Sequence, residues 1–352
     1  MLKKIKNNER GISIVDLILL VILIGGILFI CNYFINPTSE KISTTNIIET
    51  NVNSEYNIIE NQPSSNSPTV GNEYKSYFYN QLSEDAKIIY ISIINNIEVL
   101  KKGKGKIELE ITKEGIDIEF QSAWDAICLD RTDLFYIDTQ KISFVTQTST
   151  NIFGKSSYKY YIEPKNNGNY FIDSFNDEYE VQVAINEVEN KINNIINNVI
   201  SSPRYEQVKY IHDYIVENVE YNQTEAVNNS NIYGALIEGK AVCEGYAESF
   251  KYIMDKLNIP CILVYGNGVN NSGESEYHSW NQVLMDDGKW YSVDTTWDDP
   301  ILIGYGKLPE SSKYKYFLKG SKEFNENHRN ENDVSGTGQY FKYTETSVEN
   351  YR

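Results

Sequence analysis

Residues 239–247 read Gly-Lys-Ala-Val-Cys-Glu-Gly-Tyr-Ala, and this stretch decides the fold because an amphipathic helix begins within it. Apolar side chains then recur at the i, i+3, i+4, i+7 spacing of a buried helix face, at Tyr246, Ala247, Phe250, Ile253, Met254 and Leu257. Asn258 and Pro260 end the helix. Cys243 falls in its first turn, where unpaired backbone N–H groups and the helix dipole stabilise a thiolate. We therefore take Cys243 as the candidate nucleophile.

A nucleophilic thiol needs a base beside it, and the chain has three histidines to supply one. His212 lies next to Ile211 on the apolar face of a predicted helix, which is typical of a packed core histidine. His328 lies in the polar segment 325–330, and we expect no apolar side chains to hold it. His278, at the start of a predicted strand, is therefore the expected base.

The third member of a triad must orient the imidazole, and hairpin geometry indicates Asp294. Residues 277–285 and 289–294 predict two strands, and residues 286–288, Asp-Asp-Gly, fit a three-residue loop with a left-handed glycine. In that register Asp294 is diagonal to His278 on the same face of the sheet. Diagonal neighbours lie roughly 7–8 Å apart, within reach of a hydrogen bond between their side chains. A two-residue loop would put the two side chains on opposite faces.

These three blocks resemble the bacterial transglutaminase-like superfamily. Its pattern has a Cys in G-x-(A)-V-C-x-G-Y-(A), a His in H-(A/S)-W-N and an Asp in (V)-D-x-T-W. The matching stretches here are 239–247, His-Ser-Trp-Asn at 278–281 and Val-Asp-Thr-Thr-Trp at 293–297, with Ser279 where Ala is more usual. The resemblance implies a papain-like α+β core, in which a Cys-bearing helix packs on an antiparallel sheet that carries the His and the Asp.

The chemistry expected of such a triad is acyl transfer through a thioester on Cys243. Water is the abundant nucleophile outside a cell, so we expect a cysteine peptidase or amidase that acts on protein or wall peptide. A protein-cross-linking transglutaminase, in which an amine resolves the thioester, is one alternative. A non-catalytic surface binding protein that keeps the fold is another. Trp280, Trp297 and Tyr246 are candidates to line the substrate cleft, although each would also fit a core.

Composition and motifs restrict the partners. The net charge of −17 argues against a nucleic-acid partner, because phosphate binding needs clustered cations. No HExxH, CxxC or calcium-loop pattern occurs, so we expect neither a metal nor a cofactor. Asp298-Asp299-Pro300 is expected to be a strand end with a turn. Three cysteines follow Cys31, an odd number, so at least one external thiol is expected to be free.

The 352 residues are expected to divide into six segments. These are a basic cytoplasmic segment at 1–11, a transmembrane helix at 12–35, a flexible linker at 36–72, a small α/β domain of unknown role at 73–180, the transglutaminase-like catalytic domain at 181–330 and a polar tail at 331–352. Within the small domain the sequence predicts helices at 83–99 and 120–128, and strands at 141–146 and 158–163. Two further helices are expected at 181–200 and from Ser202-Pro203 onward.

The N-terminal segment predicts a membrane anchor. Residues 12–31 are apolar apart from Ser13 and Asp16, and about 20 such residues cross a bilayer core of about 30 Å. Basic residues precede this run, at Lys3, Lys4, Lys6 and Arg10, and acidic residues dominate after it. That asymmetry predicts a single-pass protein of the cell membrane with its catalytic domain outside the cell.

Two other interpretations of this segment stay open. A cleaved secretory signal would need a small-residue cleavage site, and Cys31-Asn32-Tyr33-Phe34 is a poor one. Residues 9–16 also resemble the start of type IV prepilin-like proteins, which are cut after a Gly and carry an acidic residue at the fifth mature position. Asp16 is fifth after Gly11, although Glu is the usual residue there. An intact mass that retains Met1 would exclude the prepilin interpretation.

Overall fold

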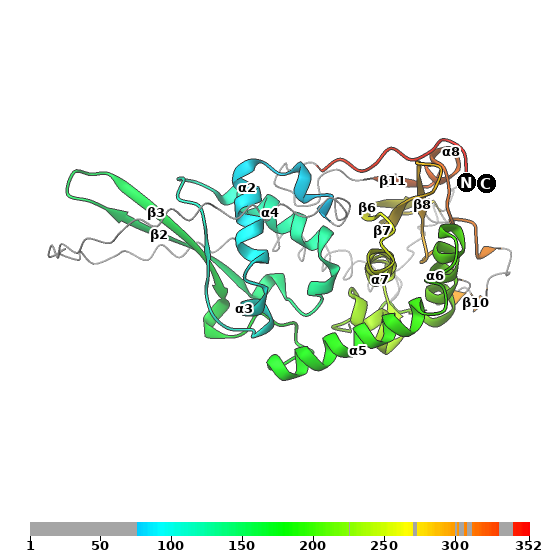
Figure 1. Ribbon diagram of the computed structural model, residues 1–352, viewed down its shortest axis with the longest axis horizontal. Helices are drawn as coiled ribbons and strands as arrows, with labels where there is room; N and C mark the ends of the chain where they lie inside the picture. The colour runs from blue at the N-terminus through cyan, green and yellow to red at the C-terminus, as the bar shows by residue number, and fades with distance from the viewer. Residues whose placement is uncertain are drawn as a thin grey trace, which may run out of the picture. The chain divides into compact units, whose positions relative to one another are not determined.

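The computed structural model describes residues 76–224, 226–269, 273–299, 312–330 and 341–352, with the backbone of 301–302 and 306–307 (Figure 1). All of these belong to one compact unit. The expected cytoplasmic segment, membrane helix and linker lie outside the described residues. Within the described ranges, no helix is long and apolar enough to cross a bilayer.

A four-stranded antiparallel sheet lies at the centre of the region after residue 177, in the order β11-β6-β7-β8. Its strands are β6 (Cys261–Val269), β7 (Ser275–Leu284), β8 (Trp290–Val293) and β11 (His328–Asn330). The helix α7 (Cys243–Lys256) packs against β6 and β7. Its buried residues include Tyr246, Phe250 and Met254 from the expected stripe, and burying each such side chain contributes about 1.5–3 kcal/mol. A helix on an antiparallel sheet is the expected α+β arrangement.

Two long helices precede α7. Helix α5 (Glu178–Ile196) begins after Asp177, whose carboxylate accepts a hydrogen bond from the backbone N–H of Glu180 at 3.0 Å. Helix α6 (Arg204–Asn218) packs against α7, and Pro203 is the residue before its first turn. Both helices were expected from the sequence, and their bounds differ from the predicted ones by a few residues.

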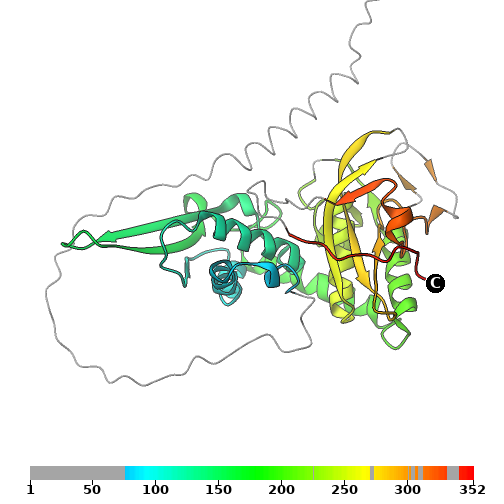
Figure 2. The ribbon, with the colours of Figure 1, turned by 90° about the horizontal axis from the view of Figure 1, so that it is seen from above.

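The region before α5 contains helices and a three-stranded antiparallel sheet in the order β1-β3-β2. The elements are η2 (Tyr79–Gln81), α2 (Glu84–Ile94), α3 (Ile97–Lys101), β1 (Ile107–Leu109), α4 (Asp117–Asp130), η3 (Thr132–Leu134), η4 (Thr139–Lys141), β2 (Ile142–Thr150), β3 (Ser156–Pro164) and η5 (Lys165–Asn167). Ser83 caps α2 as predicted, accepting a hydrogen bond from the N–H of Ala86. Figure 2 shows the β2–β3 hairpin projecting from α2 and α4.

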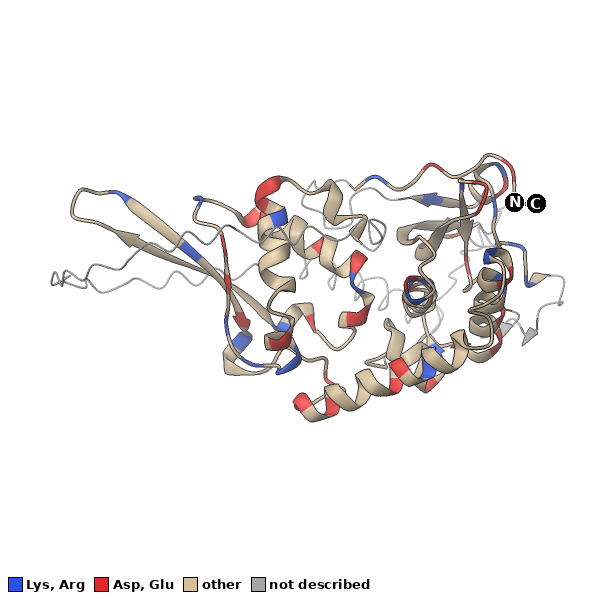
Figure 3. Cartoon of the chain, viewed as in Figure 1, with Lys and Arg blue, Asp and Glu red and all other residues tan. Residues whose placement is uncertain are grey.

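Short elements complete the chain, and charge is mixed along it. They are β4 (Glu220–Tyr221) paired in parallel with β5 (Lys240–Ala241), the single-turn π-helix η6 (Gly234–Glu238), the pair β9 (Ile301–Leu302) and β10 (Gly306–Lys307), and α8 (Ser321–Phe324). Figure 3 shows acidic and basic residues scattered over the described elements.

Buried apolar residues connect the small α/β region to the region of the four-stranded sheet. One continuous hydrophobic cluster includes residues of α2, α4, α7 and β6. The segment 341–352, expected to belong to a polar tail, joins this packing. The Phe341 side chain is fully buried, with its ring 5.3 Å from that of Phe78, and Thr346 pairs with Trp290. Phe341 brings this segment into the core, although the segment's composition is mostly polar.

We predict that Gly266→Ala will destabilise the sheet at β11. An added Cβ would lie 2.1 Å from the carbonyl oxygen of Arg329 on β11, and that oxygen is backbone and cannot move aside alone. The expected loss is about 1–3 kcal/mol in the free energy of urea unfolding, as for other overpacked sites. Val269→Ala on the same strand is the control, and an equal loss in both variants would contradict the prediction.

Candidate active site

The thiol of Cys243 lies at the first residue of α7. The preceding residue, Val242, is extended, and its N–H donates to the carbonyl of Asn229 at 2.9 Å. Gly245 has no space for a side chain, since a Cβ there would lie 2.7 Å from that of Ala241. This tight entry fixes the helix start and presents the half-buried thiol beside N-terminal amides that have no partner within the helix.

The hairpin that joins β7 and β8 has the predicted three-residue loop. Gly288 has φ +75°, and the N–H of Met285 donates to the carbonyl of Lys289 at 3.0 Å. This register pairs Asn281 with Val293, so Asp294 lies diagonal to His278. His278 Nε2 donates to Asp294 Oδ2 at 2.8 Å, which confirms the predicted His–Asp pair.

The carboxylate of Asp294 is fully buried and accepts four hydrogen bonds. Its Oδ1 accepts from the backbone N–H of Thr296 at 3.0 Å and from that of Trp297 at 3.1 Å. Its Oδ2 accepts from His278 and, at 3.1 Å, from His328. Burial alone would raise the pKa of Asp294, but the charge and hydrogen bond of His278, followed by the hydrogen bond of His328, hold it well below its ordinary value.

The imidazole of His278 contacts both the Cys243 thiol and the Asp294 carboxylate. Burial lowers its pKa, but the Asp294 carboxylate and then the Cys243 thiol, with which it hydrogen-bonds, raise the pKa to about 10. His278 is therefore protonated at neutral pH. Because Nε2 is hydrogen-bonded to Asp294, Nδ1 is the nitrogen left to interact with Cys243.

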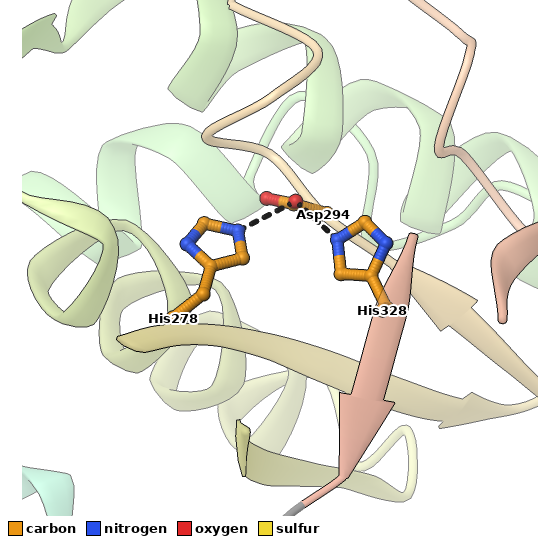
Figure 4. Close-up of side chains that lie close together, drawn as sticks. All are labelled: His278, Asp294 and His328. Atoms are coloured by element: carbon orange, nitrogen blue, oxygen red, sulfur yellow. Dashed lines mark hydrogen bonds and ion pairs between the residues drawn. The ribbon is translucent and has the colours of Figure 1, made fainter. Parts of the chain in front are cut away.

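His328 lies in the site, and the expectation that no apolar wall would hold it is wrong. Its side chain is buried on β11, where its ring stacks on that of Phe324 with centroids 3.9 Å apart and lies tilted against that of Trp297 at 4.5 Å. Figure 4 shows its imidazole and that of His278 on either side of Asp294. The aromatic walls come from several separate segments. The one sequence signal is the four-residue spacing from Phe324 to His328.

The three residues expected to line a cleft have different positions. Trp297 is half-buried and stacks on His278, with ring centroids 4.7 Å apart. Tyr246 and Trp280 are 0% and 1% exposed, so both belong to the core and do not face solvent. The hydroxyl of Tyr246 donates to Asp299 Oδ2 at 2.7 Å, which fastens α7 to the segment after Asp294.

A second buried His–Asp pair lies behind this segment. His212, predicted to be a core histidine, is fully buried and hydrogen-bonds to Asp298 Oδ2 at 3.1 Å. Asp298 Oδ1 accepts from the backbone N–H of Tyr316 at 2.8 Å. Burial raises the pKa of Asp298 to about 7, with His212 acting in the opposite direction. The hydrogen bonds of Asp298 and Asp299 therefore hold the segment that carries Asp294 in place.

One residue near the thiol was missed by sequence reasoning. Tyr221, at the end of β4, pairs with Ala241 on β5, two residues before Cys243. Burial, followed by the negative charge of a Cys243 thiolate, raises the pKa of Tyr221, so its hydroxyl keeps its proton. No motif marks this tyrosine, because its place depends on the β4–β5 pairing.

Three side chains of the site lie close enough together to be candidate metal ligands. His278, Asp294 and His328 offer three ligand atoms within 4.8 Å of one another. The two hydrogen bonds to the one oxygen, Asp294 Oδ2, account for this closeness. Within the described ranges, Cys128, Cys243 and Cys261 are all free thiols.

The pattern of the Transglutaminase-like superfamily matches residues 193–295, which span Cys243, His278 and Asp294. Residues 193–295 are a transglutaminase-like domain. No curated protein matches the sequence.

Several solved structures share similarity with the transglutaminase-like domain and its surroundings. A structure described as a TGase aligns over 60% of this chain and 55% of its own, with 17% identity and a TM-score of 0.29. A candidate cysteine protease from Cytophaga hutchinsonii aligns over 47% and 70%, with 13% identity and a TM-score of 0.28. The periplasmic domain of TgpA from Pseudomonas aeruginosa aligns over 41% and 55%, with 13% identity and a TM-score of 0.26. The chain thus spans about half the length of the first.

We predict that the stabilisation contributed by His278 will disappear at alkaline pH. Its pKa is raised from 6.5 to about 10 in the folded chain, so the contribution is complete below about pH 6.5 and is lost as pH rises through about 10. The measurement is the free energy of urea unfolding of the wild type minus that of His278→Gln, taken from pH 6 to 10.5. A difference that stays constant with pH would show that His278 is neutral in the folded protein.

Proposed function

We propose that the chain is a thiol acyl-transfer enzyme that hydrolyses amide bonds. The observation that carries the proposal is the line from the Cys243 thiol through the His278 imidazole to the Asp294 carboxylate, 2.8 Å beyond it. A buried carboxylate that keeps its charge stabilises an imidazolium, and an imidazolium stabilises a thiolate. These are the requirements of nucleophilic catalysis by cysteine.

The reaction proceeds in two steps, formation of a thioester and its hydrolysis. The Cys243 thiolate forms a bond to the carbonyl carbon, and the amide C–N bond breaks as the leaving nitrogen takes a proton from His278 Nδ1. The neutral imidazole then accepts a proton from water, whose oxygen attacks the thioester and releases the acid and the thiolate. Asp294 takes no proton in either step, since its hydrogen bonds hold its pKa well below the ordinary range.

The oxyanion formed in each step needs two donors. The backbone N–H of Cys243, at the start of α7, is the first. We assign the second to the Tyr221 hydroxyl, because the β4–β5 pairing brings this side chain near the thiol and burial keeps it protonated.

We predict that Tyr221→Phe will slow thioester formation from an amide by about 10²–10³-fold, as loss of an oxyanion donor does elsewhere. Alkylation of Cys243 by iodoacetamide forms no oxyanion, so its rate should be unchanged. Equal slowing of both reactions would indicate a structural role for Tyr221 instead.

The location and substrate belong to the same proposal. The N-terminal sequence supports a single-pass anchor in the cell membrane with the catalytic domain outside, where water is abundant and protein or wall peptide is the accessible substrate. Cross-linking is separated from hydrolysis by offering a glutamine peptide and a labelled amine. Release of ammonia without an adduct supports the hydrolase, and a stable labelled adduct supports a transglutaminase.

We predict that Cys243 in the full chain will react with iodoacetamide at pH 6.5 faster than Cys128 or Cys261. Peptide mass spectrometry measures the rate at each cysteine. His278→Ala should slow Cys243 at least about tenfold, because the thiolate loses its counter-charge. His212→Ala, which removes a buried histidine of the other pair, is the matched control. If Cys243 is no faster than the other thiols in the wild type, the non-catalytic alternative is favoured.

A further inference from the structure

The two oxygens of Asp294 accept hydrogen bonds from different kinds of donor. Both backbone donors go to Oδ1, from Thr296 and Trp297. Both imidazoles go to Oδ2, from His278 at 2.8 Å and His328 at 3.1 Å. The two backbone donors are enough to orient the carboxylate. The hydrogen bond from His328 therefore needs an explanation other than orientation.

His328 is held in place independently of Asp294. Its backbone pairs with Gly268 on β6, and its ring stacks on Phe324 at 3.9 Å. The Nδ1 atom contacts Asn327 Oδ1 at 3.0 Å, and the amide of Asn327 donates to the hydroxyl of Tyr316 at 2.7 Å. The ring therefore presents Nε2 to Asp294 from a rigid position.

Sharing an oxygen weakens each of the interactions made to it. An N–H from His328 neutralises part of the charge on Oδ2, so that charge attracts the His278 imidazolium less strongly. This matters for the reaction, because the leaving nitrogen must take its proton from His278. An unshared, fully buried carboxylate would hold that proton more firmly and make His278 a poorer acid.

We propose that His328 is a positioning residue that shares Asp294 Oδ2 with His278, and thereby keeps the His278 proton available for transfer to the leaving group. The proposal rests on the acyl-transfer function proposed above. His328 acts through Asp294 and touches no reacting atom. In the described part of the chain, this makes the site a group of four residues: Cys243, His278, Asp294 and His328.

The groups around the pair act on the pKa of His328 in opposite directions. Burial, and the positive charge of His278 after the opposing effect of Asp294, lower the pKa of His328. The titratable groups facing the two imidazoles are Cys243 on α7, Asp294 after β8, and Tyr316, whose ring centroid lies 5.1 Å from that of His328. Asp298 adds its negative charge behind Asp294.

The test is an NMR titration of the full chain labelled with ¹⁵N-histidine, which contains three histidines. His278→Gln identifies the His278 signal. In His328→Leu, which has no donor, the pKa of His278 should rise by about one unit, a tenfold gain in proton affinity. In His328→Gln, whose amide N–H reaches about as far as Nε2, it should stay at the wild-type value. If His328→Leu does not fold, the shorter His328→Asn replaces it, with the same expected rise.

His212→Leu is the matched control, because His212 is also fully buried and hydrogen-bonded to an Asp oxygen at 3.1 Å. An equal rise in that variant, or no rise in His328→Leu, would overturn the proposal. So would a change in the wild-type His278 and His328 signals on adding EDTA, which would mean that the trio holds a metal ion. Alkylation of Cys243 at pH 6.5 is measured in parallel. If it is slow in the wild type, the acyl-transfer function fails, whatever the titration shows.

Discussion

The buried carboxylate of Asp294 is the constraint on which the site depends. A carboxylate with no exposed surface is costly unless it is hydrogen-bonded and paired, and this one accepts four hydrogen bonds. Two of its donors belong to the backbone just after it, and two come from β7 and β11. The sheet order β11-β6-β7-β8 makes this convergence possible, because both imidazole-bearing strands flank β6. Moving β7 or β11 would take one of the two imidazole donors away from the buried charge.

The thiol comes to this centre from a different element. Cys243 is at the first residue of α7, and α7 is fixed on β6 and β7 by its apolar stripe. Tyr246, one turn into the helix, is tied to Asp299 through its hydroxyl. The nucleophile and the carboxylate are thus connected twice, once through His278 and once through the Tyr246–Asp299 hydrogen bond. The second connection explains why the tyrosine is buried and does not line a cleft.

Sequence reasoning predicted the local parts of this arrangement. The helix stripe, the three-residue loop at Gly288 and the diagonal placement of His278 and Asp294 follow from short periodicities and turn chemistry, which the chain encodes within a few residues. It failed for His328 and Tyr221. Their environments are assembled from β6, β5 and separate aromatic side chains, so no neighbouring residue reveals them. It also failed for Trp280, since an aromatic side chain near a candidate active-site histidine fits a cleft and a core equally well until the packing is known.

The segment from Asp294 to Asp299 shows how three nearby carboxylates acquire different roles. Asp294 receives two backbone N–H groups and two imidazoles, and this excess of donors keeps its pKa well below the ordinary range. Asp298 receives one imidazole and one backbone N–H, lies near the charge of Asp294, and has a pKa raised to about 7. Only the first can stabilise an imidazolium throughout a reaction at neutral pH. Asp298 and Asp299 hold the backbone in place, and because they do so from buried positions, the geometry around Asp294 is fixed before any substrate arrives.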